Sequence, residues 1–159
     1  MWTRYFLVTT SLPDVNVWIA LAAGGHIHHV AAREWFAVQP DASVAFCRIT
    51  QMGLLRLLTN VNVMRPAPRT VAQAWEVFAQ LRRDRRLVFM TEPDGVESVW
   101  HGLMTQRGVG PSSWTDAYLA ALALRSSCLL VTFDNGFARW AGLKLKLLAI
   151  SETSPNRTA

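Results

Sequence analysis

The chain has 159 residues, 51% of them apolar and 17% charged, and its net charge is +5. This length suits one domain with its own core, and the apolar fraction excludes wholesale disorder. No apolar run approaches the ~20 residues of a membrane-spanning helix, so we expect no membrane segment. The 16 basic residues outnumber the 11 acidic ones. This balance suits a polyanionic partner such as a nucleic acid but does not by itself establish one.

The first part of the chain alternates short apolar runs with helical patterns. Gly24 and Gly25 are expected to stop the first helix, and Thr50 is expected to cap the third. The elements expected here are a strand ending near Asp14, helices over about 16–23 and 28–38, a strand over 43–47, a helix over 50–59 and a loop over 60–69.

The same alternation continues to the end of the chain. Thr70 and Ser113 each precede an apolar helical pattern and are expected to be N-caps. The expected elements are helices over 70–83, 96–106 and 113–126, strands over 87–90 and 129–132, a short helix over 135–140 and a final strand over 146–150.

Short apolar strands that alternate with helices predict a parallel sheet covered by helices on both faces. Active sites of such sheets lie at the carboxyl ends of the strands. We expect residues 1–8 to form an extension, residues 9–150 to form the domain, and residues 151–159 to form a polar tail.

Three aspartates occupy positions of this kind. Asp14 ends the first strand, and Asp134 ends the strand that begins at residue 129. Asp116 lies in the first turn of the helix over 113–126. Each alone is compatible with a turn or a helix cap, whereas the three together suit a shared site. Two carboxylates ~4 Å apart repel by about 4 kcal/mol at an effective dielectric near 20, so a cation is needed. Oxygen ligands alone favour Mg²⁺ or Mn²⁺.

Three segments resemble motifs of the PIN-domain family in the family's order: residues 12–21, 114–123 and 130–137. A fourth segment, 49–59, resembles a helix of actinobacterial VapC-type toxins of type II toxin–antitoxin systems. The resemblance covers about residues 8–150. It implies an α/β/α sandwich with a short parallel central sheet, and a cytoplasmic, Mg²⁺-dependent endoribonuclease toxin.

The resemblance also assigns roles to individual residues. Asp14, Asp116 and Asp134 match the family's acidic positions, which are catalytic and hold the metal. Asn16 matches a residue that helps to orient the first acid. Thr132 matches a hydroxyl position beside the fourth acid, and is equally compatible with an ordinary strand threonine.

One position departs from the family's pattern. The second acid of the family is usually a glutamate early in the third helix, and Gln51 stands there instead. An amide can accept a hydrogen bond but brings no charge. Glu92 or Asp94 is a possible substitute carboxylate. Two alternatives therefore stay open: a weakly catalytic or non-catalytic PIN protein that binds RNA or a partner, and a DNA-directed nuclease on the same scaffold.

The VapC-type resemblance implies partners as well as an activity. It implies a VapB-like antitoxin whose C-terminal segment wraps the toxin and presents a basic side chain to the acids, and it implies toxin dimers. The apolar helices over 16–23 and 50–59 either line a groove for such a partner or are buried in the core of the chain itself.

Two clusters outside these motifs have alternative interpretations. His26, His28 and His29 form a loop that leads into a helix, and metal or RNA binding is the alternative. The second cluster follows the helix over 70–83 and suits either a solvated helix end or a rim that contacts phosphate. Its members are Arg82, Arg83, Arg85 and Arg86.

Four tryptophans have predicted environments. Trp35 and Trp75 fall on apolar helix faces and are expected in the core. Trp18 and Trp114 lie near the acidic motifs, where an indole could stack on a base, but we expect core packing for both.

The two cysteines, Cys47 and Cys128, lack any metal-ligand spacing, and we expect buried free thiols in a reducing cytoplasm. The N-terminal residues lack the long apolar stretch of a signal peptide, which also predicts a cytoplasmic protein.

Overall fold

The computed structural model describes residues 8–149 and contains one five-stranded sheet with every neighbouring pair parallel. The strands lie in the order β3-β2-β1-β4-β5. Their bounds are β1 (Ser11–Pro13), β2 (Val44–Phe46), β3 (Leu87–Phe89), β4 (Leu129–Thr132) and β5 (Leu145–Leu147). The expected end of the last strand at residue 150, the extension over 1–7 and the tail over 151–159 lie outside the described residues.

Six α-helices and two 3₁₀ turns connect the strands of the described chain. The α-helices are α1 (Val15–Ala22), α2 (His29–Ala37), α3 (Arg48–Leu58), α4 (Val71–Arg82), α5 (Val96–Met104) and α6 (Trp114–Ser126). The 3₁₀ turns are η1 (Pro111–Ser113) and η2 (Asn135–Arg139). Every element expected from the sequence is present, with ends that differ by at most three residues.

The helix caps agree with the sequence at one of three positions. Thr70 caps α4 by accepting a hydrogen bond from the backbone N–H of Gln73 at 3.2 Å. Thr50 does not cap α3, because the helix already begins at Arg48. Its hydroxyl instead accepts from the Cys47 backbone N–H, at 3.2 Å. Ser113 precedes α6 but makes no side-chain capping bond.

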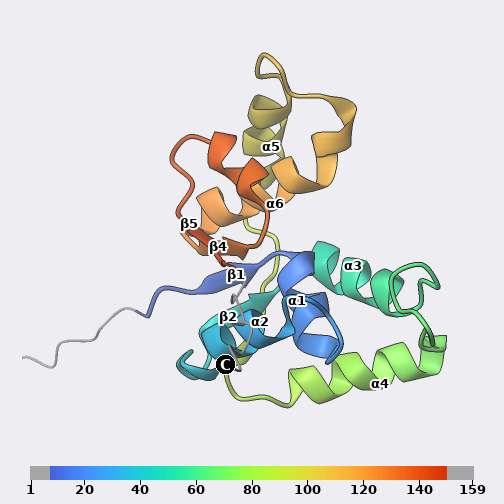
Figure 1. Cartoon of the computed structure of the whole chain (residues 1–159). Helices are drawn as coiled ribbons and strands as arrows, with labels where there is room; N and C mark the ends of the chain where they lie inside the picture. Colours follow the sequence, from blue (N-terminus) through green and yellow to red (C-terminus); the bar gives the residue numbers. More distant parts are fainter. Residues whose placement is uncertain (1–7, 150–159) are drawn as a thin grey trace, which may run out of the picture.

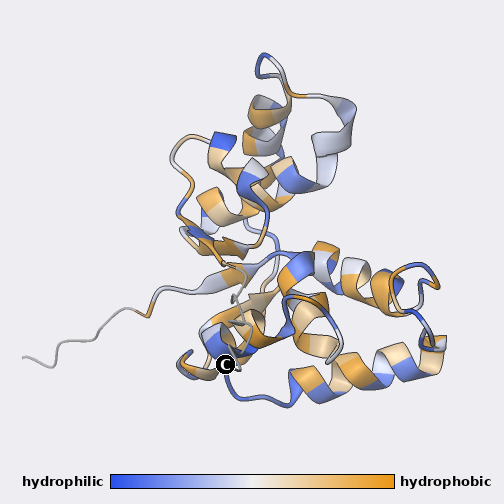
Figure 2. Cartoon of the chain, in the orientation of Figure 1, coloured by the Kyte–Doolittle hydropathy of each residue, from blue (hydrophilic) through white to orange (hydrophobic). Residues whose placement is uncertain are grey.

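The sheet separates two hydrophobic cores. α5 and α6 cover one face and α1 to α4 cover the other, as Figure 1 shows. Successive strand residues point to opposite faces. Accordingly, Ala45 joins the core under α5 and α6, while its neighbours Val44 and Phe46 join the other core. Figure 2 shows that hydrophobic colour dominates the strands and α1. The expected α/β/α sandwich with a short parallel sheet is confirmed.

The tryptophans divide into two buried and two exposed side chains. Trp18 is fully buried and stacks on Phe46 with ring centroids 3.6 Å apart, and Trp35 is also buried. The expectation of core packing is wrong for Trp75 and Trp114, which are 51% and 54% exposed. Trp75 follows Ala74, one of the two buried residues of α4, so its indole lies about 100° around the helix from the packed side.

One further expectation is met by the two cysteines. Cys47 and Cys128 are buried free thiols, as predicted. Within residues 8–149, no helix has both the length and the apolar character needed to cross a membrane.

Candidate active site

The candidate site lies where β1 and β4 run side by side in the middle of the sheet. Pro13 pairs in register with Val131, and the backbone N–H of Asp14 donates to the Val131 carbonyl at 2.8 Å. The chain leaves β1 toward β2 on one side and reaches β4 on the other. Such a switch in strand order opens a crevice at the carboxyl ends of the strands. Asp14 and Thr132 meet there.

Asp14 is held by two hydrogen bonds and is only 8% exposed. Its Oδ1 accepts from the backbone N–H of Val15 at 2.6 Å, so the carboxylate caps the N-terminus of α1. Its Oδ2 accepts from the Thr132 hydroxyl at 3.0 Å. These bonds fix the carboxylate plane and leave each oxygen with a lone pair for a ligand.

The Thr132 hydroxyl connects the two strand ends. It donates to Asp14 and accepts from the Asn16 amide Nδ2 and from the backbone N–H of Asp134, each at 3.0 Å. The Asn16 Oδ1 in turn accepts from the Phe133 backbone N–H at 3.3 Å. Thr132 is fully buried, so its bond to Asp14 is shielded from water. Asn16 thus acts on Asp14 through Thr132.

Asp116 and Asp134 come from the two elements that flank β4. Asp116 lies in the first turn of α6 and is partly exposed. Asp134 is exposed and caps η2, where its Oδ1 accepts from the Gly136 backbone N–H at 2.7 Å. A Cβ at Gly136 would lie 3.0 Å from that oxygen, so glycine permits the close turn.

The three carboxylates interact electrostatically. The pKa of Asp14 is raised from 3.8 to about 6, chiefly by burial and to a smaller extent by the charges of Asp116 and Asp134, while its two hydrogen bonds lower it. Burial first and the Asp134 charge second raise the pKa of Asp116. No ion pair among the described residues involves any of the three. One shared acidic site for Asp14, Asp116 and Asp134 stays a prediction, and these electrostatic effects are its support.

Comparison with known proteins identifies the family. The PIN-domain family model matches residues 11–143. The chain is 43% identical over 143 residues to Ribonuclease VapC41 of Mycobacterium tuberculosis, a match that covers 87% of this chain and 98% of the relative. The chain belongs to the PIN-domain family, among its VapC-type members. Ribonuclease VapC38 of the same organism is 36% identical over 126 residues, which cover 79% of this chain and 86% of that relative.

Solved structures share the PIN fold at low sequence identity. VapBC from Salmonella typhimurium bound to DNA superposes with a TM-score of 0.64 at 18% identity, covering 87% of this chain and 97% of that chain. VapC20 of M. tuberculosis, described as a sarcin–ricin loop cleaving toxin, superposes with a TM-score of 0.63 at 18% identity. That match covers 81% of this chain and 93% of the other.

The position of the usual second acid of PIN domains is buried and already bonded. Gln51 is 5% exposed, and its Oε1 accepts from Nη1 of Arg48 at 2.5 Å. The Arg48 guanidinium also lies 4.9 Å from the centre of the Phe89 ring. The amide oxygen of Gln51 is thus directed to an arginine of its own helix. The i, i+3 spacing of Arg48 and Gln51 is the one sequence feature that indicates this pairing.

The suggested substitute carboxylates have other surroundings. Glu92 accepts a hydrogen bond from the Tyr118 hydroxyl, and it is not among the groups that shift the pKa of Asp14 or Asp116. Asp94 offers its backbone carbonyl to the Arg125 guanidinium, with Nη2 at 2.8 Å. Neither carboxylate is among the charges that raise the pKa of Asp14 or Asp116.

The donor chemistry of the site suits a hard divalent cation. The three carboxylates repel one another, and one of them is buried with a raised pKa. A doubly charged cation relieves this repulsion more than a singly charged one does. No three His, Cys, Asp or Glu side chains within residues 8–149 are arranged as a metal cluster as they stand. The fit to Mg²⁺ or Mn²⁺ therefore rests on ligand type and charge.

The histidine loop packs beside the end of β4. The His28 ring stacks on Phe133 with centroids 4.2 Å apart, and Nδ1 of His29 lies 2.7 Å from the Ala20 carbonyl oxygen. His26 accepts a hydrogen bond from the His28 backbone N–H at 3.1 Å. These contacts suit a structural loop, and no metal cluster among the described residues includes it.

The arginine cluster is partly engaged within the fold. Arg86 pairs with Asp84 at 2.6 Å and lies 3.9 Å from the centre of the Phe36 ring. Arg85 pairs with Asp41 at 3.0 Å. These two arginines bond to acidic residues beside the segment that precedes β3. This weakens the prediction that the cluster contacts phosphate.

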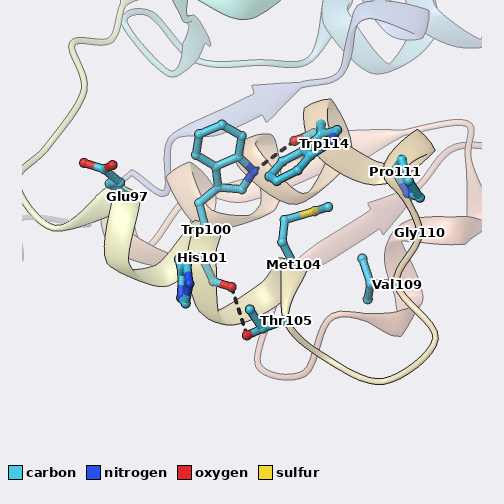
Figure 3. Close-up of a pocket in the computed structure, with 9 residues that line it drawn as sticks. All are labelled: Glu97, Trp100, His101, Met104, Thr105, Val109, Gly110, Pro111 and Trp114. Carbon is cyan, nitrogen blue, oxygen red and sulfur yellow. Dashed lines mark hydrogen bonds between the residues drawn. The ribbon is translucent and has the colours of Figure 1, made fainter.

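A pocket of about 470 Å³ between α5 and the start of α6 was not indicated by any sequence motif. Figure 3 shows Trp100, Met104 and Trp114 along its wall. The indole Nε1 of Trp100 donates to the Trp114 carbonyl at 3.0 Å, and the two rings meet edge-on with centroids 5.5 Å apart. No local sequence pattern indicates this pocket, because separate segments supply its two sides.

Proposed function

We propose that this chain is a VapC-type toxin that acts as a divalent-metal-dependent endoribonuclease on cellular RNA in the cytoplasm. The observation that carries the proposal is the buried Asp14 carboxylate, whose charge interacts with Asp116 and Asp134 at the carboxyl ends of β1 and β4. The 43% identity to a protein named as a ribonuclease supports the same activity.

In this proposal, Asp14, Asp116 and Asp134 hold Mg²⁺ or Mn²⁺. When bound, the cation supplies a polarised water and positive charge for in-line attack on a phosphodiester. The chain's own part is to position the ligands: Thr132 and the Val15 amide fix the two oxygens of Asp14. Because Asp14 already accepts both hydrogen bonds in the folded chain, its carboxylate is oriented before any ligand arrives.

We also propose a VapB-like antitoxin as the partner, with the toxin as a homodimer. Structures of VapBC complexes from Salmonella typhimurium and from Haemophilus influenzae have the same fold as this chain, which supports such a complex. An acidic site without a described cationic partner attracts an arginine or lysine from an inhibitor. Co-expression with the small protein encoded next to the toxin, then gel filtration and a cleavage assay, tests the complex. Separate elution with continued cleavage would refute it.

The activity is tested on matched RNA and DNA strands with Mg²⁺, Mn²⁺ or chelator present. We expect metal-dependent cleavage of RNA alone, and its loss in Asp116→Asn and Asp134→Asn. Asp41→Asn is the matched control, because Asp41 is an exposed aspartate that pairs with Arg85 instead.

Two other outcomes point to the alternatives. Cleavage of DNA at a comparable rate would favour a DNA-directed nuclease. RNA binding without cleavage would favour a non-catalytic binding protein, the reading motivated by the uncharged Gln51.

A further inference from the structure

A second pocket, of about 500 Å³, adjoins the acidic site. Its wall includes Val15, which directly follows Asp14, and Thr115, which directly precedes Asp116. The remaining wall comes from the C-terminal half of α3 and the turn after it, and includes Arg56 and Asn60. The sequence neighbours of two of the three acids therefore form part of the pocket wall.

The polar side chains of this pocket offer unused hydrogen-bond donors. The exposed guanidinium of Arg56 makes no hydrogen bond or ion pair with any described residue. Asn60 uses its Oδ1 to accept from the Asn62 backbone N–H at 2.8 Å, so its amide N–H groups stay available. The Thr59 hydroxyl is not an available donor, because it donates to the Leu55 carbonyl. The free groups at Arg56 and Asn60 therefore match an anion.

We propose that this pocket is a phosphate subsite in which Arg56 binds the RNA backbone next to the phosphodiester to be cut. The inference rests on the proposed ribonuclease function and extends it to a substrate-positioning residue. Three carboxylates repel a polyanion, so a strand that reaches them needs a nearby positive contact. An arginine fork pairs with phosphate through two parallel hydrogen bonds, and Arg56 is placed to supply them.

The test measures cleavage of a short single-stranded RNA by wild type, Arg56→Met, Arg56→Lys and Arg107→Met. Arg107 is an exposed arginine outside the pocket and serves as the matched control. We expect Arg56→Met to raise KM about tenfold while kcat changes less than about threefold, since the lost contact is charge-assisted. Arg56→Lys keeps the charge and should recover part of the loss, and Arg107→Met should match wild type.

Salt dependence gives a second readout that loss of folding cannot imitate. Using Asp134→Asn protein to prevent cleavage, the slope of log affinity against log salt should fall by about 0.7 when Arg56 is replaced, which is one single-strand phosphate contact. Circular dichroism confirms that each variant is folded.

The outcomes separate the subsite from the function. If wild type cleaves RNA and Arg56→Met keeps both KM and the salt slope, the subsite is refuted and the ribonuclease proposal stands. The subsite is also refuted, and the ribonuclease proposal also stands, in two further cases. In one, Arg56→Met weakens only inhibition by the antitoxin; in the other, it lowers kcat at constant KM. If wild type neither binds nor cleaves RNA, the proposed function itself fails.

Discussion

Replacement of Asp14 by asparagine should change the pH dependence of stability in a calculable way. Burial and neighbouring charges raise the pKa of this carboxyl from 3.8 to about 6 in the folded state. Between these values the folded state holds the proton more tightly than the unfolded state, so stability falls as pH rises from 4 to 6. At about 1.36 kcal/mol per pKa unit, the penalty above pH 6 is about 3 kcal/mol. The asparagine variant lacks this penalty.

The substitution also has a cost that does not depend on pH. Both oxygens of Asp14 accept hydrogen bonds, and an amide nitrogen in place of one oxygen would face either the Val15 N–H or the Thr132 hydroxyl. The Thr132 oxygen already accepts from Asn16 and from the Asp134 backbone, so it has no lone pair left. An unsatisfied donor here costs about 1–3 kcal/mol.

The assay is urea unfolding of both proteins between pH 4 and pH 8 in chelator. We expect Asp14→Asn to be less stable than wild type at pH 4. Its stability relative to wild type should then rise by about 3 kcal/mol by pH 7, which leaves it equal or slightly more stable. A difference between the two proteins that stays constant with pH would refute the argument that burial of an ionised Asp14 is costly.

Three further substitutions test the supports of the site. Thr132→Val should abolish metal-dependent cleavage and lower the free energy of unfolding by about 1–3 kcal/mol, measured by urea titration. The reason is that the buried Asp14 carboxylate, the Asn16 amide and the Asp134 backbone N–H all lose the same partner. Gly53→Ala should lower the free energy of unfolding by about 1–3 kcal/mol and reduce cleavage, because the new Cβ would lie 2.8 Å from Val15 Cγ2. Gly102→Ala is the control: no atom lies near its new Cβ, so it should stabilise its helix. Gln51→Glu should change Mn²⁺ affinity by less than tenfold in calorimetry, since its arginine partner neutralises the added charge.

The sequence predicted the order and type of the elements because its apolar periodicities are clear and its turns carry glycine or proline. It also placed Asp14 and Asp134 at one edge of the sheet, since both follow buried strands and parallel strands end at the same edge. Asp116 joined them through the resemblance of its motif. These three positions depend on local pattern and chain direction alone.

Packing at the periphery could not be predicted in the same way. Trp75 and Trp114 have the hydrophobicity of core residues, but α4 buries only Ala74 and Phe78, and Trp114 begins a helix at the surface. Whether such a face is covered depends on which elements reach it in three dimensions. The bond from Arg48 to Gln51 could not be predicted for a related reason. It depends on the side-chain rotamers of the two residues, and their spacing alone does not determine it.

The site is assembled from two halves of the chain that meet where β1 pairs with β4. Asp14 and Asn16 belong to the first half, Thr132 and Asp134 belong to the second, and the Thr132 hydroxyl bonds to both. The buried charge of Asp14 opposes folding, while the strand pairing that brings it to Thr132 favours folding. A ligand that neutralises the acids therefore stabilises the folded chain as it binds. The same linkage applies to a divalent cation and to a basic side chain from an inhibitor, so the two should compete for one acidic site.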